Sequence, residues 1–309
     1  MGKTALLFPG QASQYVGMGK DLYDHSEEVR ALYELAGREM GVDIARLSFE
    51  GPAEELKRTA NTQPAILLHS LAVLAVMKDN LPSFDYAAGH SLGEYGALAV
   101  AGALTFEDAV KAVVKRASLM EEACVKNPGT MAAIMGLAMD RVREVCEKVD
   151  GVVVPANVNS SIQLVISGDV AAVEKAAALA REAGAKRAVM LEVGGAFHSP
   201  LMEPARAGLE EYLKTIAIKT PDKPVIANVT AQPVNDAAGI RELLVQQVVA
   251  PVRWAETMSY LSANGVDTII EIGPGTVLSG LAKREMRPAK SINLDKLADV
   301  QAFVGAGVN

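Results

Sequence analysis

Short apolar runs and longer amphipathic segments alternate along most of this 309-residue chain. Short apolar runs are typical of strands buried in a sheet, and apolar residues recurring every three or four positions are typical of helices packed on it. The alternation predicts a mainly parallel sheet covered by helices. Strands are predicted at residues 4–8 and 85–88, and helices at 94–101 and 105–123.

The middle of the chain follows a different order of elements, strand-helix-strand-strand-helix-strand, which is that of a ferredoxin-like fold. We therefore expect a ferredoxin-like small domain at residues 125–195, inserted into an α/β-hydrolase-like large domain formed by residues 1–124 and 196–309. The substrate would lie in the cleft between them. The predicted strands are 130–136, 152–156, 163–167 and 186–193, and the predicted helices are 140–148 and 171–183.

Composition narrows the class of protein and its location. Half of the residues are hydrophobic, and the two cysteines do not suggest a disulfide framework, which favours a reducing cytosol. The longest apolar run, residues 64–77, is too short to span a bilayer, and the first ten residues lack the layout of a signal peptide. We expect a soluble cytoplasmic protein without a membrane partner, loosely held after Asp295.

Residues 89–93 read Gly-His-Ser-Leu-Gly, a Gly-x-Ser-x-Gly motif between a predicted strand and a predicted helix. The five-residue match alone is weak evidence, because it arises by chance in about one chain of this length in ten, but in a strand-turn-helix setting it predicts a nucleophile elbow. The glycines let strand and helix approach closely. Ser91 would lie at a helix N-terminus, where free N–H groups stabilise developing negative charge. We interpret Ser91 as a nucleophile.

Four histidines are candidates for the base that a serine nucleophile needs. His25 lies in a charged segment and is expected at the surface. His69 interrupts an apolar helix and is expected to be a hydrogen-bonded core residue. His90 adjoins the serine, and neighbours at a tight turn point apart. His198 lies in a glycine-rich loop between a strand and a helix, where catalytic groups are often placed, so we favour it as the general base.

Two further parts of a catalytic site have weaker signals. Asp267 and Glu271 lie on a predicted buried strand, so no acid is placed beside His198, and a dyad remains possible instead of a triad. The polar turn at residues 9–14 follows a predicted strand and could present a backbone N–H that partners the N–H of Leu92 in an oxyanion hole. Taken alone, this segment is only a turn.

Arg116 lies off the polar stripe of its predicted helix and shares a face with Ala109, Ala112 and Leu119. Its guanidinium would therefore extend into the interior or a cleft. A semi-buried arginine needs a partner, and its planar fork of donors suits a carboxylate. The alternatives are a structural salt bridge or a side chain that reaches solvent. The functional interpretation is that the substrate brings the carboxylate.

Several segments occur in the order found in one family, and the chain resembles the malonyl-CoA:acyl carrier protein transacylases of bacterial fatty-acid synthesis. The resemblance extends from about Ala5 to Arg284. The family's usual GQGSQ reads GQASQ here, with Ala12 in place of glycine. The matching segments are FPGQASQ, NTQPA (61–65), GHSLGEY (89–95), KRASLM (115–120), NVNSSIQLVISG (157–168), FHSPLM (197–202), QQVVAPVRW (246–254) and EIGPGTVLSGL (271–281).

The resemblance implies roles for the residues around the reacting groups. Ser91 would be the acylated nucleophile and His198 its base and later acid. The backbone N–H groups of Gln11 and Leu92 would form the oxyanion hole. Gln247 would orient His198 through its main-chain carbonyl, which would explain why no third acid is found.

The resemblance also implies how the acyl group is selected. Arg116 would bind the malonyl carboxylate, and Gln63 and Asn159 fall at positions similar to pocket residues. Malonyl-selective relatives tend to carry phenylalanine before the base histidine, and here that residue is Phe197. Its bulk would disfavour methylmalonyl by about 1 to 3 kcal/mol, a preference and not an exclusion.

The implied reaction moves malonyl from malonyl-CoA to the thiol of holo acyl carrier protein through a malonyl-serine, with a coenzyme A thioester as substrate and neither a metal nor a bound cofactor. The alternatives are a serine thioesterase or esterase, a polyketide-pathway acyltransferase, or a non-catalytic scaffold. A net charge of -7 argues against a nucleic-acid partner. Carrier proteins are also acidic, so docking would need a basic patch, for which Lys186, Arg187, Lys283, Arg284 and Arg287 are candidates.

Overall fold

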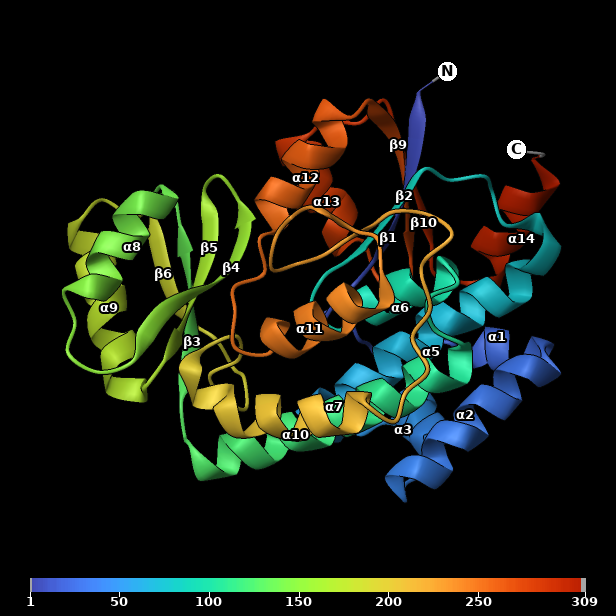
Figure 1. Cartoon of the computed structure of the whole chain (residues 1–309), viewed down its shortest axis with the longest axis horizontal. Coiled ribbons are helices and arrows are strands. Elements are labelled where there is room, and N and C mark those ends of the chain that lie inside the picture. Colours follow the sequence, from blue (N-terminus) through green and yellow to red (C-terminus); the bar gives the residue numbers. More distant parts are fainter. Residues whose placement is uncertain (1, 307–309) are drawn as a thin grey trace.

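The computed structural model describes residues 2–306 and contains two separate β-sheets (Figure 1). The larger sheet has six strands and is parallel except for one short strand at its edge. This confirms the expected mixed α/β architecture with a mainly parallel sheet. In spatial order its strands are β10 (Lys290–Leu294), β9 (Val266–Ile272), β1 (Lys3–Phe8), β2 (Tyr86–Gly89), β7 (Val225–Ile226) and the antiparallel β8 (Pro233–Val234).

Strand β1 lies in the middle of this sheet, between β2 and β9. Its residues Leu6 and Phe8 pack into the core on one face, and Ala5 and Leu7 pack into the core on the other. A strand covered on both faces reads as a continuous apolar run, which explains the sequence pattern at its position.

Helices cover both faces of the six-stranded sheet. The helix α5 (Thr59–Met77) is mostly apolar, is buried on nearly all sides and packs against α7 (Phe106–Lys126). Among the described residues α5 alone is long and apolar enough to cross a membrane, and 89% of its most apolar window is buried inside the protein. The other helices outside residues 125–195 are α1 (Lys20–His25), α2 (Glu27–Met40), α3 (Ile44–Glu50), α4 (Ala53–Lys57), α6 (Gly93–Val100), α10 (Glu203–Leu213), α11 (Ala237–Gln247), α12 (Trp254–Ala263), α13 (Val277–Glu285) and α14 (Leu297–Gly305), with 3-10 turns at Lys78–Asn80 and Pro200–Met202.

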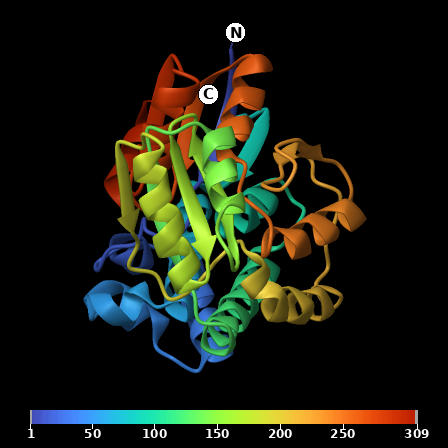
Figure 2. The same cartoon turned by 90° about the vertical axis from the view of Figure 1, so that its left-hand side faces the viewer.

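The smaller sheet is antiparallel, and its elements follow the order expected from the sequence. Two helices cover its outer face, on the side turned toward the viewer in Figure 2. The strand expected at 152–156 extends to Ser160 because Val158 and Ser160 also pair with Leu164 and Gln163 of the next strand, and Asn157 forms an isolated bridge to Val252. In chain order the elements are β3 (Thr130–Met135), α8 (Met139–Glu147), β4 (Val153–Ser160), β5 (Gln163–Gly168), α9 (Val170–Glu182) and β6 (Arg187–Met190).

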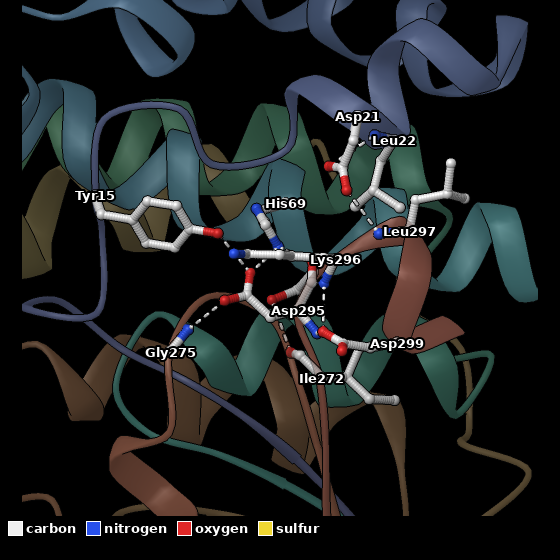
Figure 3. A network of polar contacts seen from close by, with 11 residues as sticks. Tyr15, Asp21, Leu22, His69, Ile272, Gly275, Asp295, Lys296, Leu297 and Asp299 are labelled. Carbon is white, nitrogen blue, oxygen red and sulfur yellow. Dashed lines mark hydrogen bonds and ion pairs between the residues drawn. The ribbon is translucent and has the colours of Figure 1, made fainter. Parts of the chain in front are cut away.

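The chain after Asp295 is firmly held, so the expectation of a loose end is wrong for residues 296–306. The Asp295 carboxylate accepts hydrogen bonds from the Tyr15 hydroxyl at 2.9 Å and from the Gly275 N–H at 3.3 Å, and its Oδ1 lies 3.0 Å from His69 Nε2 (Figure 3). Farther on, the side chains of Val300 and Phe303 in α14 are buried. Residues 307–309 lie outside the described part.

Parallel strands place their carboxyl ends at one edge of a sheet. At this edge the segments that follow β1, β2 and β9 meet, and Asp295 at the end of β10 ties the first of them to the third through Tyr15 and Gly275. The predicted serine turn follows β2, and the predicted polar turn follows β1. The sheet therefore brings both turns to the same place.

Candidate active site

Ser91 lies at a sharp turn between β2 and α6, with a left-handed φ of 52°. A Cβ on Gly89 would lie 2.0 Å from the Gly93 carbonyl group, and a Cβ on Gly93 would lie 2.2 Å from the Phe8 carbonyl oxygen. Neither position has room for any side chain. The two glycines thus let the helix start directly against the sheet, as the sequence motif predicts.

The Ser91 hydroxyl and the His198 imidazole lie together, although 107 residues separate them in the chain. The distance from Ser91 Oγ to His198 Nε2 is 2.9 Å, and His198 Nδ1 lies 2.8 Å from the main-chain oxygen of Gln247. A carbonyl oxygen only accepts hydrogen bonds, so Nδ1 carries the hydrogen and Nε2 is free to accept the serine proton. The imidazole is thus oriented by a carbonyl group where a triad would use a carboxylate.

Burial, and after it the positive charge of Arg116, lowers the pKa of His198 to about 3. The imidazole is therefore neutral at physiological pH, which is the protonation state that a general base requires. Glu271 is not the missing acid, because its carboxylate accepts the N–H groups of Leu278 and Ser279 at the start of α13. Asp267 lies at the other end of β9, away from the carboxyl edge.

The N–H groups of Gln11 and Leu92 have no hydrogen-bond acceptor among residues 2–306, and both residues line the same cavity as Ser91. The turn that carries Gln11 is fixed by bonds from Ser13 Oγ to the Gly10 carbonyl and from the Ala12 N–H to Gln14 Oε1. Ala12 has a left-handed φ of 80°. Alanine thus adopts the conformation that glycine favours, at a cost of about 1 to 2 kcal/mol.

Arg116 is buried, with 1% of its surface exposed, and its guanidinium reaches the serine. Nη2 donates to Ser91 Oγ and to Gln247 Oε1, each at 2.9 Å, while Nη1 donates to Gln63 Oε1. No carboxylate within residues 2–306 forms an ion pair with it, and its buried Nε–H has no partner there. The alternatives of a structural salt bridge and of a solvent-reaching side chain are therefore wrong.

A cavity of about 360 Å³ lies between the two sheets, and Gln11, Ser91, Leu92 and His198 line it. The cavity wall includes Gln63, Asn159 and Phe197. The His90 side chain does not hydrogen-bond to the Ser91 hydroxyl. Its Nε2 lies 2.9 Å from Asn159 Oδ1, and this contact connects the serine turn to β4. The other lining residues are Gly10, Ala12, Met120, Met131, Ala133, Met135, Asn157, Gln163, Val165, Leu191, Val193, Val277, Leu278 and Leu281.

The other two histidines lie where the sequence analysis predicts, one at the surface and one in the core. His25 is exposed at the end of α1. His69 is a buried residue of α5 whose Nε2 lies 2.7 Å from the Asp295 main-chain oxygen.

Sequence reasoning missed two buried polar residues behind the elbow, Asn228 and Glu94. Asn228 Oδ1 accepts the Ser91 N–H at 2.7 Å, and its Nδ2 donates to the Gly89 carbonyl at 2.7 Å. Glu94 Oε2 accepts the Asn228 N–H at 3.0 Å and Gln247 Nε2 at 2.8 Å. The available signal was Glu94 itself, a carboxyl group inside an otherwise apolar helix.

Comparison with known proteins gives the family to which this fold and this site belong. Residues 5–300 match the acyl transferase domain family. The chain is 48% identical over 295 residues to the malonyl CoA-acyl carrier protein transacylase of Bacillus subtilis, which covers 94% of this chain and 93% of the relative.

Two solved structures are similar over almost the whole chain. An acyl carrier protein S-malonyltransferase from Vibrio cholerae has a TM-score of 0.91 and 40% identity, covering 97% of this chain and 99% of that one. A malonyl-transacylase in complex with a type II polyketide acyl-carrier protein has a TM-score of 0.92 and 38% identity, covering 98% and 99%. The chain belongs to the acyl transferase family.

Proposed function

We propose that this protein transfers malonyl from malonyl-CoA to the phosphopantetheine thiol of acyl carrier protein in fatty-acid biosynthesis, through a malonyl-Ser91 intermediate. The observation that carries the proposal is a buried guanidinium that has no ion pair within residues 2–306 and lies 2.9 Å from a serine hydroxyl, which is itself 2.9 Å from a neutral imidazole. The names of the relatives support the same reaction.

The first half-reaction acylates the enzyme. His198 Nε2 takes the proton of Ser91 Oγ while the oxygen attacks the thioester carbonyl carbon. Negative charge develops on the carbonyl oxygen, and the N–H groups of Gln11 and Leu92 stabilise it. The carbon–sulfur bond then breaks, and the coenzyme A thiolate leaves with the proton from His198.

The second half-reaction reverses these steps with a different thiol. His198 takes the proton of the carrier's phosphopantetheine thiol, and the thiolate attacks the malonyl ester. The ester bond to Ser91 breaks, and Oγ recovers its proton from His198. Both halves use one oxyanion hole and one base, and the imidazole alternates between base and acid. The coenzyme A thioester enters as substrate, and no bound cofactor takes part in the proposed steps.

Arg116 would bind the carboxylate of the malonyl group, which lies one methylene group from the ester carbonyl. A guanidinium that contacts Ser91 Oγ is close enough to reach that carboxylate. Gln63 holds the other side of the guanidinium, and Asn159 and Phe197 line the cavity beside it. We assign Phe197 the exclusion of bulkier acyl groups such as methylmalonyl.

A serine thioesterase is the second candidate, because it would use the same nucleophile and base. Arg116 favours the transacylase, since hydrolysis of an uncharged acyl group gives no reason for a buried guanidinium without an ion pair. A polyketide pathway would use the same chemistry with another carrier, and one similar structure contains such a carrier.

The deciding experiment mixes the protein with malonyl-CoA, with and without holo acyl carrier protein. We expect a malonyl adduct on Ser91 by mass spectrometry and rapid malonyl-carrier formation when the carrier is present. Ser91→Ala should lose the adduct and slow transfer by roughly 10³-fold or more, whereas Ser118→Ala on the polar face of α7 should do neither. Rapid release of free malonate without carrier would instead identify a thioesterase.

We also propose that residues 125–195 form a ferredoxin-like domain inserted into an α/β-hydrolase-like domain of residues 1–124 and 196–309. The strand order β4-β5-β3-β6, with both helices on one face, supports the first part. The serine turn between β2 and α6 supports the second. We expect the enzyme to be located in the cytoplasm, together with its proposed substrates.

We further propose that a basic patch at the cavity mouth attracts the acidic carrier. Arg284 donates to Gln163, a residue of the cavity wall, so this end of α13 lies beside the entrance. All five candidate side chains are exposed: Lys186, Arg187, Lys283, Arg284 and Arg287.

A further inference from the structure

Within the described part of the chain, the hydrogen-bond partners of Arg116 are all uncharged. Its Nη2 donates to the side-chain oxygen of Gln247 and to Ser91 Oγ, and its Nη1 donates to Gln63. A guanidinium needs acceptors on a defined side to point its remaining donors toward a substrate. The orientation of the Gln247 amide therefore decides how Arg116 faces the serine.

The orientation of that amide is fixed by Glu94, a buried residue of α6 with 2% of its surface exposed. Gln247 Nε2 donates to Glu94 Oε2 at 2.8 Å and to the Ser91 carbonyl at 3.0 Å. Both partners are acceptors, so the amide nitrogen faces them and the amide oxygen faces Arg116. If the amide were rotated by 180°, its N–H groups would point at the guanidinium and its oxygen at two other oxygens.

We propose that Glu94 is a positioning residue for acyl-group selectivity, acting through the Gln247 side chain to hold Arg116 against Ser91 in the orientation that receives a carboxylate. This role rests on the proposed malonyl transfer and assigns a function to a carboxyl group that the transfer mechanism does not use.

The interposed amide has a physical advantage over direct contact. A carboxylate bonded directly to Arg116 would form a bidentate ion pair and occupy the donors that an incoming malonyl group needs. A carboxyl group one residue farther away orients the guanidinium and leaves it unpaired. The acceptor atom is Oε2, which also receives the Asn228 N–H. A glutamine at position 94 can supply an oxygen in the same place.

The test compares malonyl-CoA with acetyl-CoA as acyl donors, using kcat/KM for transfer to holo carrier, in wild type, Glu94→Gln and Glu94→Ala. We expect Glu94→Ala to lower the malonyl-to-acetyl ratio by about tenfold, the loss of one well-placed hydrogen bond. Glu94→Gln should keep the ratio near that of wild type. A ratio that stays constant in Glu94→Ala, whatever the loss of total activity, would mean that Glu94 only supports the fold.

A second variant keeps the test decisive if Glu94→Ala does not fold. Gln247→Met removes the amide but leaves the main-chain oxygen that orients His198, so malonyl transfer should fall about tenfold more than acetyl transfer. Gln246→Met, on the exposed side of the same helix, is the matched control and should leave the ratio unchanged. Equal ratios in both variants would refute the role of Glu94. Failure of the wild type to transfer malonyl would refute the proposed function itself.

Discussion

At the scale of single residues, Ser91 and His198 share an unusual backbone conformation. Their φ angles are 52° and 56°, in the left-handed region that costs a non-glycine residue roughly 1 to 2 kcal/mol. Such strain persists where neighbours fix the backbone. Asn228 bonds the Ser91 N–H, and the Gln247 main-chain oxygen bonds the His198 ring.

The pKa of His198 leads to a prediction about pH. An ordinary histidine is half protonated near pH 6.5, whereas burial and Arg116 lower the pKa here to about 3. The neutral ring is the reactive form, so the rate of Ser91 acylation by malonyl-CoA should stay level as the pH falls from 8 to about 5. Stopped-flow measurement of coenzyme A release across this range tests it. Burial raises the pKa of Glu94 to about 7, so Glu94→Gln removes the other buried group that could titrate here. An acid limb near pH 6.5 that persists in Glu94→Gln would contradict the prediction.

Arg116→Ala should weaken malonyl transfer much more than acetyl transfer. Loss of one partner of a buried charge pair costs about 2 to 5 kcal/mol, or roughly 30-fold to several thousandfold in kcat/KM. Acetyl has no carboxylate and should lose less than about tenfold. Lys115→Ala, next to it in α7, is the control. Equal losses for both donors would remove Arg116 as the carboxylate-binding residue.

The residues found from sequence alone were those with local signals. Ser91 lies between glycines at the end of a strand, and Arg116 interrupts the apolar face of a helix. The resemblance, and not the pattern, supplied the role of Gln247. Asn228 and Glu94 were missed because their roles depend on tertiary contacts, in which one buried polar group satisfies another.

At the scale of elements, periodicity predicted the strands and helices around the serine turn and within residues 125–195, since apolar burial determines both. The errors lie at the ends of elements, which depend on pairing partners that periodicity does not show. Strand β4 continues to Ser160 because Val158 and Ser160 pair with Leu164 and Gln163 of β5. The segment after Asp295 is ordered because the Leu297 N–H donates to the Asp21 carboxylate, far away in sequence, and the side chains of Val300 and Phe303 are buried. A polar sequence does not reveal such partners.

Asp295→Ala should destabilise the protein more than Tyr15→Phe does. The first change leaves the Tyr15 hydroxyl and the Gly275 N–H without their acceptor, at a cost of about 2 to 3 kcal/mol, and the second loses one hydrogen bond worth about 1 kcal/mol. Urea unfolding measures both. Tyr23→Phe is the control, because that hydroxyl makes no hydrogen bond within residues 2–306 while its ring packs on Phe49. Equal free energies for all three variants would contradict the role of Asp295.

At the scale of the whole molecule, the cavity depends on contacts between the two units. The Val158 N–H donates to the Val252 carbonyl at 2.9 Å, and Glu285 accepts the Ser161 N–H at 2.9 Å. These bonds hold β4 beside α13, and both elements line the cavity. The order of predicted elements indicated an inserted segment with its own sheet, but it did not indicate this contact with the rest of the chain. None of the residues that form the contact stands out in the local sequence pattern.

The place of β1 in the larger sheet predicts the effect of shortening the chain. A chain that ends at residue 264 lacks β9. One edge of the apolar strand β1 would then have unpaired backbone N–H and C=O groups. We expect it to aggregate on expression, whereas a chain ending at residue 306 should remain soluble. Centrifugation of lysates compares the two. A soluble, monomeric 264-residue chain would contradict this account of the sheet.

The central position of β1 also constrains the order of events on the ribosome. Its neighbour β9 starts at Val266. Strand β1 emerges first from the ribosome and therefore cannot pair with β9 until most of the chain has been synthesised. At roughly 5 to 20 residues per second, the wait is on the order of ten to fifty seconds. During that time the apolar N-terminal strand is a natural client for a chaperone at the tunnel exit, while the residues of the smaller sheet, contiguous in sequence, are free to pair among themselves.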